Sequence, residues 1–325
     1  MAVPTRRRGA GLLAAATATR PRRAGVITAA TLIAVVVLVL ADALVLTGRV
    51  PRLDVTPTGS GAGRTYLLVA SDSRERLDAA DRSRYADANQ PRGERADLVL
   101  LLRAPEDGPA RLYSVPRDLY VGEQRKVPHR LGLALADGPQ ALVDSLCTDV
   151  GVGVDHVVVA DFDALVGLID TVGGIPVTVA EPTRDRRAQL DLRGGTQRLD
   201  GRQALAWVRS RHPQVLRGGT WVADPAADPT RSTHAAQVLG GVSAALDDPV
   251  TVQRALWAAG PSLRRDHGLG LPQLLSMARA LRGAAAAGVV TVPAQLEDTT
   301  VPFAFVTDAT TAALRPLRSP GCATG

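Results

Sequence analysis

Short apolar runs and helical patterns alternate along most of this chain. Apolar runs bounded by turn-forming residues predict strands at 66–70, 98–103, 111–115, 154–159, 175–179, 289–292 and 303–306. Apolar residues at helical spacing predict helices over 131–146, 162–172, 201–208, 232–246, 250–258 and 271–281. Because strands and helices interleave, we predict an α/β fold in which helices cover a central sheet.

One apolar segment is long enough to cross a bilayer. Residues 24–41 carry no charge, and the apolar character continues to Leu46 across Asp42. This length predicts a transmembrane anchor over 24–47. A cleavable signal peptide is the alternative, since Ala41-Asp42-Ala43 loosely resembles a cleavage site.

The charge distribution orients this anchor. No acidic residue precedes Asp42, whereas six arginines do: Arg6, Arg7, Arg8, Arg20, Arg22 and Arg23. The positive-inside rule therefore places the N-terminus in the cytoplasm and the rest of the chain outside it, at the plasma membrane. The formal net charge of +6 equals the number of these arginines, so the remainder is neutral. This balance argues against a nucleic-acid-binding domain.

Composition shifts divide the chain into five parts. We predict a basic cytoplasmic tail (1–23), the anchor (24–47), a linker (48–63), an extracytoplasmic folded domain (64–310) and a C-terminal tail (311–325). Within the domain, the polar stretches 73–94 and 217–229 are typical of long loops.

Two cysteines, Cys147 and Cys322, fall in the outer part. An extracytoplasmic setting permits a disulfide between them, and two buried thiols are the alternative. The chain has no Cys-x-x-Cys motif and no His/Cys cluster, which argues against structural zinc.

Charged side chains gather at the predicted strand ends. The first strand runs into Asp72 and Arg74, Asp97 opens the next strand, and Arg117-Asp118 follows the third. The carboxyl ends of strands are where α/β sheets place ligands. Two aspartates near arginines suit a magnesium-bridged diphosphate, because Mg²⁺ takes few carboxylates and arginine binds phosphate bidentately. Local ion pairing and turn capping could explain each motif taken alone.

A second pair of arginines, Arg209 and Arg211, ends the helix predicted at 201–208. Two arginine side chains directed to the same site could bind the oxygens of a diphosphate. Residues two apart share a face only in an extended segment, so the chain would have to leave the helix near Trp207. A solvated basic helix end is the alternative.

Two other features have simpler explanations. The apolar helix face of Phe162, Val166 and Ile169 is typical of a protein core, and a lipid-tail pocket is the alternative. The five histidines are scattered and form no plausible Ser–His–Asp set.

The motifs in this order resemble the LytR-CpsA-Psr family. The matching runs are LLVASDSR, RADLVLLL, LYSVPRDLYV, VDHVVVADFDALVGLIDTVGGIPV and LDLRGGTQRLDGRQALAWVRSRH. They agree with the family from about Arg64 to Gly240. The resemblance implies a domain with a central mixed β-sheet. It also implies a membrane-anchored enzyme of Gram-positive type that transfers a glycopolymer from a polyprenyl diphosphate carrier to peptidoglycan. The arginine- and alanine-rich composition suggests an actinobacterial source.

The resemblance also implies roles for individual residues. Asp72 and Asp97 would hold Mg²⁺. The diphosphate would be bound by Arg117, Arg209, Arg211 and Arg231, with support from Arg74, Asp118 and Arg130. The resemblance does not identify the general base, the polymer or the acceptor position.

This sequence departs from the family pattern at three places. Arg130 stands in place of a usual lysine, and Leu131-Gly132 stands in place of Ile-Asn. His234-Ala235-Ala236 replaces Arg-Gln-Gln, and a frequent cysteine pair appears as Thr178 and Thr196. Because polar contacts to the diphosphate are lost at 234–236, a non-catalytic polyprenyl-diphosphate-binding scaffold is one alternative. A polyprenyl-diphosphate hydrolase is another.

Overall fold

The computed structural model describes residues 48–72, 94–122, 128–210, 212–224, 227–246, 248–297 and 303–322, with scattered positions between 34 and 46. Two compact units are separated at residues 46 and 47, and the fold below is that of the second. The expected anchor at 24–47 lies largely outside the described residues. Among those that are described, no helix is both long enough and apolar enough to traverse a bilayer.

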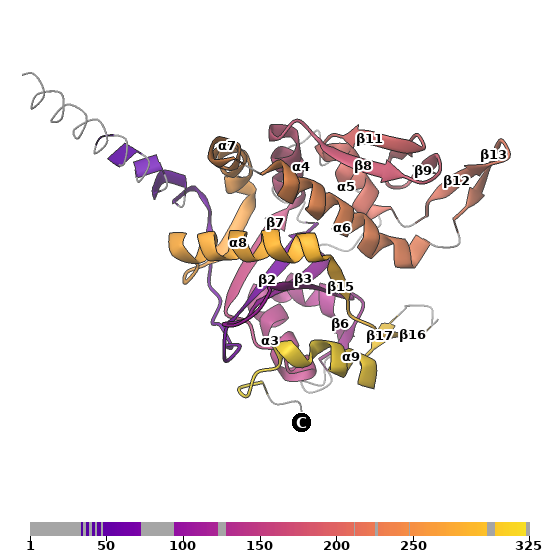
Figure 1. Ribbon diagram of the computed structural model, residues 1–325. Helices are drawn as coiled ribbons and strands as arrows, with labels where there is room; N and C mark the ends of the chain where they lie inside the picture. The colour runs from indigo at the N-terminus through magenta and orange to yellow at the C-terminus, as the bar shows by residue number, and fades with distance from the viewer. Residues whose placement is uncertain are drawn as a thin grey trace, which may run out of the picture. The chain divides into compact units, whose positions relative to one another are not determined.

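A seven-stranded mixed sheet lies at the centre of the second unit (Figure 1). Its strands, in spatial order, are β1 (Arg52–Leu53), β14 (Leu263–Asp266), β7 (His156–Asp161), β2 (Arg64–Ser71), β3 (Ala96–Ala104), β4 (Arg111–Val115) and β15 (Val289–Thr291). Strand β2 pairs parallel with β7 and antiparallel with β3, and β4 pairs antiparallel with β3 and parallel with β15. The structure therefore confirms the mixed sheet.

Alternate side chains of the sheet enter two separate cores. In β2, Leu67 and Val69 belong to a core with α3 (Pro139–Val150), whereas Tyr66 belongs to a core with α8 (Leu271–Ala287). This follows from the two-residue repeat of a strand, in which successive side chains point to opposite faces. Helices therefore cover both faces of the sheet, as expected.

The helix predicted over 131–146 is in fact two elements. A 3-10 helix, η1 (Leu131–Asp137), is followed by α3, and Gly138 between them has φ 101°. That positive φ breaks the helix, and Pro139 occupies the first turn of α3 where its missing N–H costs nothing.

A further group of elements packs around its own core, which includes Ile169, Ile175 and Trp207. Its helices are α4 (Phe162–Thr171), α5 (Gly201–Arg209) and α6 (Ala227–Ala245). Strands β8 (Ile175–Val179) and β11 (Gly195–Leu199) form a two-stranded antiparallel sheet. A four-stranded sheet contains β10 (Leu190–Leu192), β9 (Thr183–Asp185), β12 (Gln214–Arg217) and β13 (Thr220–Ala223). The predicted loop at 217–229 is therefore wrong: it contains β13 and the start of α6.

The remaining elements complete the domain. Helix α7 (Pro249–Ala259) packs against α4 and leads into η2 (Gly260–Ser262). Two short hairpins are formed by β5 (Tyr120–Val121) with β6 (His129–Arg130), and by β16 (Gln295–Glu297) with β17 (Phe303–Phe305).

The segment expected as a C-terminal tail is folded. Helix α9 (Asp308–Leu314) and η3 (Arg315–Leu317) bury Leu314 and Leu317 in the sheet's core. Cys322 forms a disulfide with Cys147 of α3. The tail prediction is therefore corrected, because these buried leucines and the covalent link fix the segment to the domain.

Candidate active site

The sheet topology brings several charged strand ends to one edge. Strands β2 and β7 are parallel and end there, while β3 and β14, antiparallel to them, begin there. Strand β4, antiparallel to β3, also ends at this edge. We call it the ligand edge, since α/β sheets bind ligands at carboxyl strand ends.

Asp72 and Asp97 lie together at the ligand edge. Asp72 is 8% exposed, and its Oδ1 accepts the backbone N–H of Arg95 at 2.8 Å. The β2–β3 register passes from Ala70–Leu98 to Ser71–Ala96, which makes Asp97 the extra residue of a β-bulge. Bulges re-aim a side chain, and they are common beside active sites. The structure therefore brings the two predicted metal carboxylates to neighbouring strand ends.

Arg117 connects Asp97 to Asp118. Its guanidinium forms an ion pair with Asp97, and its Nε lies 3.5 Å from Oδ2 of Asp118. Arg130 approaches the other oxygen of Asp118 at 3.3 Å. These four side chains are between 17% and 28% exposed, so the ion pairs are partly shielded and open to a ligand. Local ion pairing, the alternative explanation for these motifs, is therefore present, and the same side chains also form the predicted cluster.

Gly132 permits this arrangement. Its N–H donates to the carbonyl oxygen of Arg117 at 2.7 Å. An added Cβ at Gly132 would lie 2.6 Å from the carbonyl oxygen of Ala96 and 3.2 Å from Cβ of Arg117. The departure from the family at this position thus lets η1 pack directly against the ligand edge.

Arg209 reaches the same edge from α5. The helix begins with a capping box at Asp200 and Gln203, and Arg209 is its last residue. The Arg209 guanidinium lies 4.8 Å from the centre of the Phe162 ring. Phe162 directly follows Asp161, which is opposite Ser71 in the sheet. Arg209 is therefore close to the end of β2, where Asp72 lies.

Asp185 is a residue that sequence reasoning missed. It is 2% exposed, and its Oδ2 accepts the hydroxyl of Ser210 at 2.8 Å and the backbone N–H of His212 at 2.9 Å. Its Oδ1 accepts the N–H groups of Arg187 and Ala188. Asp185 therefore holds the chain on both sides of position 211, just beyond Arg209. No signal in the linear sequence connects β9 to this segment.

A buried ionic cluster beneath the ligand edge was also missed. Arg264 of β14 forms ion pairs with Glu94 and Asp161, and Ser71 donates to Glu94. Burial lowers the pKa of Arg264, but the two carboxylates outweigh this effect and raise it, so the guanidinium stays charged. The cluster connects the ends of β2 and β7 with Glu94, two residues before the start of β3.

Three predicted site residues lie outside what the structure describes. They are Arg74, Arg211 and the side chain of Arg231. The lipid pocket expected at Phe162, Val166 and Ile169 stays a prediction. Ile169 is fully buried in a packed core, and Phe162 is 5% exposed beneath Arg209. Val166 is half-buried, with its backbone against Gly201.

The residues of α6 that differ from the family pattern are buried in the structure. His234 is 6% exposed and stacks on Trp207 with ring centres 3.6 Å apart. Burial lowers its pKa to about 4, and a hydrogen bond between Nδ1 and the Trp207 carbonyl at 3.1 Å only partly opposes this. Ala235 is also buried.

Thr178 and Thr196 lie directly opposite each other, with hydroxyl oxygens 3.0 Å apart.

A sequence profile of the LytR_cpsA_psr family matches residues 57–314. The chain belongs to this family. An enzyme of the same family from Actinomyces oris has the same fold, with a TM-score of 0.69 and 30% identity over 84% of this chain and 98% of that one.

The names of two relatives state a cell-wall function. The probable cell wall biosynthesis protein LcpB of Corynebacterium glutamicum is 33% identical over 196 residues, which cover 59% of this chain and 47% of that protein. The polyisoprenyl-teichoic acid–peptidoglycan teichoic acid transferase TagT of Bacillus subtilis is 31% identical over 164 residues, 47% of this chain and 48% of its own. This chain thus spans about half the length of each. Family relatives are therefore named for cell-wall biosynthesis and teichoic acid transfer.

Proposed function

We propose that this protein is a membrane-anchored phosphotransferase that moves a glycopolymer from a polyprenyl diphosphate carrier to peptidoglycan. The observation that carries the proposal is the ligand edge, where Asp72 and Asp97 lie beside Arg117, with Arg209 close by. Carboxylates for a metal and guanidiniums for phosphate oxygens are what phosphoryl transfer requires.

The reaction needs one bond exchange. A hydroxyl of the acceptor sugar attacks the phosphorus that carries the glycopolymer. The bond from that phosphorus to the bridging oxygen breaks, polyprenyl phosphate leaves, and the hydroxyl proton is released. Arg117 and Arg209 would neutralise the charge that grows on the phosphate oxygens, which is the main form of catalysis in phosphoryl transfer.

The residues at the ligand edge fit Mg²⁺. In the part of the chain that the structure describes, no three His, Cys, Asp or Glu side chains gather into a full metal cage. Mg²⁺ is usually held by one or two carboxylates and completes its shell with waters and phosphate oxygens. Asp72 and Asp97 would supply those carboxylates. The ion would neutralise the diphosphate and, by competing for Asp97, leave the Arg117 guanidinium available to the substrate.

The proposed location is the outer face of the plasma membrane, with the N-terminus in the cytoplasm and the anchor at 24–47. The Cys147–Cys322 disulfide supports this proposal, because stable disulfides belong to oxidising compartments. Peptidoglycan and the lipid-linked donor would both be reachable there.

One observation favours a second candidate function. His234 and Ala235, which replace polar residues of the family pattern, are both buried, His234 against Trp207 of α5, and do not offer polar contacts at the surface. A scaffold that binds polyprenyl diphosphate without turnover would tolerate this loss. The paired carboxylates favour the transferase, because binding alone does not need a metal site.

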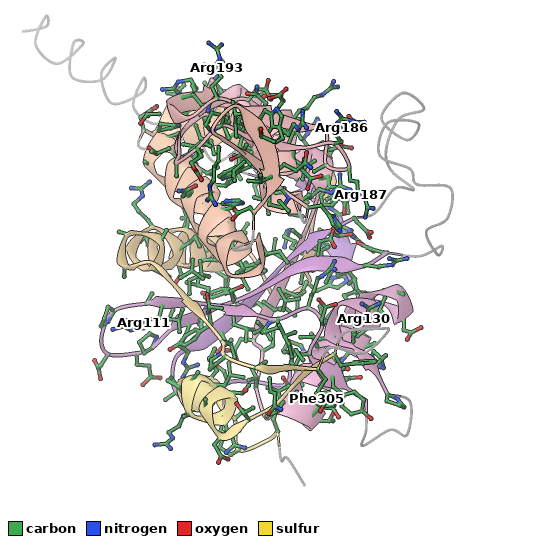
Figure 2. The ribbon with its side chains drawn as sticks, turned by 90° about the vertical axis from the view of Figure 1, so that its right-hand side faces the viewer. Arg111, Arg130, Arg186, Arg187, Arg193 and Phe305 are labelled. Carbon is green, nitrogen blue, oxygen red and sulfur yellow. A yellow bond between two sulfur atoms is a disulfide. The ribbon has the colours of Figure 1, made fainter. Side chains whose placement is uncertain are left out.

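The test is a transfer assay with the full chain, a synthetic polyprenyl-diphosphate oligosaccharide, Mg²⁺ and a soluble peptidoglycan fragment. We expect a phosphodiester-linked product that falls about a hundredfold or more in Arg209→Gln. Arg193→Gln is the matched control, because Arg193 is an exposed arginine in the same group of elements (Figure 2). Free glycan phosphate without transfer would identify a hydrolase, and tight binding without turnover would identify a scaffold.

A further inference from the structure

An aromatic cluster adjoins the ligand edge and has no role in the transfer chemistry above. We call Tyr120, Phe303 and Phe305 the aromatic platform. Ring centres are 5.6 Å apart between Tyr120 and Phe303, and 5.2 Å between Tyr120 and Phe305. Aromatic residues are only 3% of the chain, and two of its three phenylalanines are here. This concentration calls for an explanation.

Backbone contacts fix the platform next to the charged cluster. The N–H of Ala304, between the two phenylalanines, donates to the carbonyl oxygen of Asp118 at 2.9 Å. Tyr120 pairs with Arg130 across the β5–β6 hairpin, and Arg130 binds Asp118. The platform therefore begins two residues beyond the Arg117-Asp118 motif. Arg130 and Phe305 both belong to the side of the molecule that Figure 2 turns to the viewer.

Polar groups stand around the rings. In the β16–β17 hairpin, Gln295 is opposite Phe305 and Glu297 is opposite Phe303. Residues directly opposite each other in antiparallel strands share a face, so an amide and a carboxylate flank the two rings. Gln295 and Glu297 are exposed, whereas Tyr120, Phe303 and Phe305 are half-buried and so keep part of their surface accessible.

This combination matches a sugar ring better than the other chemistries at hand. The face of an aromatic ring carries partial negative charge, which attracts the C–H groups on the face of a pyranose. Amide, carboxylate and guanidinium groups at the rim can pair with its hydroxyls. A prenyl chain would leave those rim groups unused, and Glu297 would repel a polyphosphate.

We propose that the aromatic platform is a carbohydrate subsite that binds a hexopyranose ring beside the reacting diphosphate. The source of that sugar rests on the proposed function: it belongs either to the donor glycan or to the peptidoglycan acceptor. In both cases the platform would hold a sugar ring near the phosphorus and so contribute to substrate binding.

The first test measures binding without any chemistry. The full chain, in a detergent that has no sugar headgroup, is titrated with a soluble N-acetylglucosamine oligosaccharide and followed by calorimetry and saturation-transfer NMR. We expect Phe305→Ala to weaken binding about three- to tenfold and Phe305→Tyr to restore it. Leu296→Ala is the control, because Leu296 is 61% exposed in the same hairpin but points to its other face. Equal affinity in all variants, equal loss in Leu296→Ala, or no binding by the unaltered chain would overturn the proposal.

The second test identifies the source of the sugar and separates this inference from the proposed function. In the transfer assay, Phe305→Ala should raise the KM of either the acceptor fragment or the lipid-linked donor, with kcat retained. The KM that rises names the source, and a change in neither would contradict the subsite. If no transfer occurs but the oligosaccharide still binds in a Phe305-dependent manner, the proposed function fails and the carbohydrate subsite stands.

Discussion

The buried histidine on α6 predicts an acid-sensitive link between α5 and α6. His234 is 6% exposed and stacked on Trp207, and its pKa is lowered to about 4, mainly by burial. In the unfolded chain a histidine has a pKa of about 6.5. As the pH falls below about 6.5, His234 becomes protonated in the unfolded chain but stays neutral in the folded protein. The folded state therefore loses stability between about pH 6.5 and pH 4.

The size of this loss follows from the two pKa values. Each pKa unit corresponds to about 1.4 kcal/mol, so a difference of roughly 2.5 units gives about 3 kcal/mol. The penalty is absent above pH 7 and complete below pH 4. Since the unfolding free energy of a domain is commonly about 5–15 kcal/mol, the effect is large enough to measure.

The assay is urea unfolding of the full chain in mild detergent at pH 7, 6, 5 and 4, followed by tryptophan fluorescence. His234→Phe keeps an aromatic ring on Trp207 and removes the titration, so between pH 7 and pH 4 it should lose about 3 kcal/mol less than the unaltered protein. His267→Asn is the control, because the His267 side chain is 58% exposed. If His234→Phe and the unaltered protein lose the same stability over this range, the reasoning is refuted.

Three further predictions concern the site and its support. Asp185→Asn should weaken binding of the diphosphate donor about tenfold, measured by calorimetry, because it puts an amide donor among the N–H groups around Ser210; unchanged affinity would rule out a role in positioning Arg209. Gly132→Ala should cost about 1–3 kcal/mol in urea unfolding and reduce transfer, because its Cβ would meet the Ala96 carbonyl, whereas wild-type behaviour would show that the edge can relax. Cys147→Ser should lower the unfolding free energy by about 5 kcal/mol, because the disulfide joins residues 175 apart, and a loss below about 1 kcal/mol would contradict that role.

Elements with strong apolar periodicity could be predicted from the sequence, and those fixed by distant contacts could not. Strand β4 and β8 match their predictions residue for residue, because their apolar runs end at clear turn signals. Strands β9 and β12 were missed, since their short arginine-containing segments have no apolar run. The break at Gly138 was also missed, because the apolar spacing continued through a Gly-Pro pair that ends a helical element.

The candidate site divides in the same way. Asp72, Asp97 and Arg117 stand at strand ends that the sequence pattern already indicated, and the mixed pairing of β2, β3 and β4 explains why they meet. The bulge at Asp97 depends on the register in which β2 pairs with β3, which the sequence pattern does not show. The roles of Asp185 and Arg264 depend on partners 25 and 170 residues away, which no local pattern can show.

Transfer of a glycopolymer phosphate to peptidoglycan at the ligand edge can be detected in the product itself. Mass spectrometry of the peptidoglycan fragment, after incubation with the lipid-linked donor and Mg²⁺, shows whether the glycan has become attached through a phosphodiester. A transferase at the ligand edge should give this product with the unaltered chain and at least about a hundredfold less with Asp97→Asn. Equal product from both proteins, or none from an unaltered chain that binds the donor, would contradict the proposed transfer at the ligand edge.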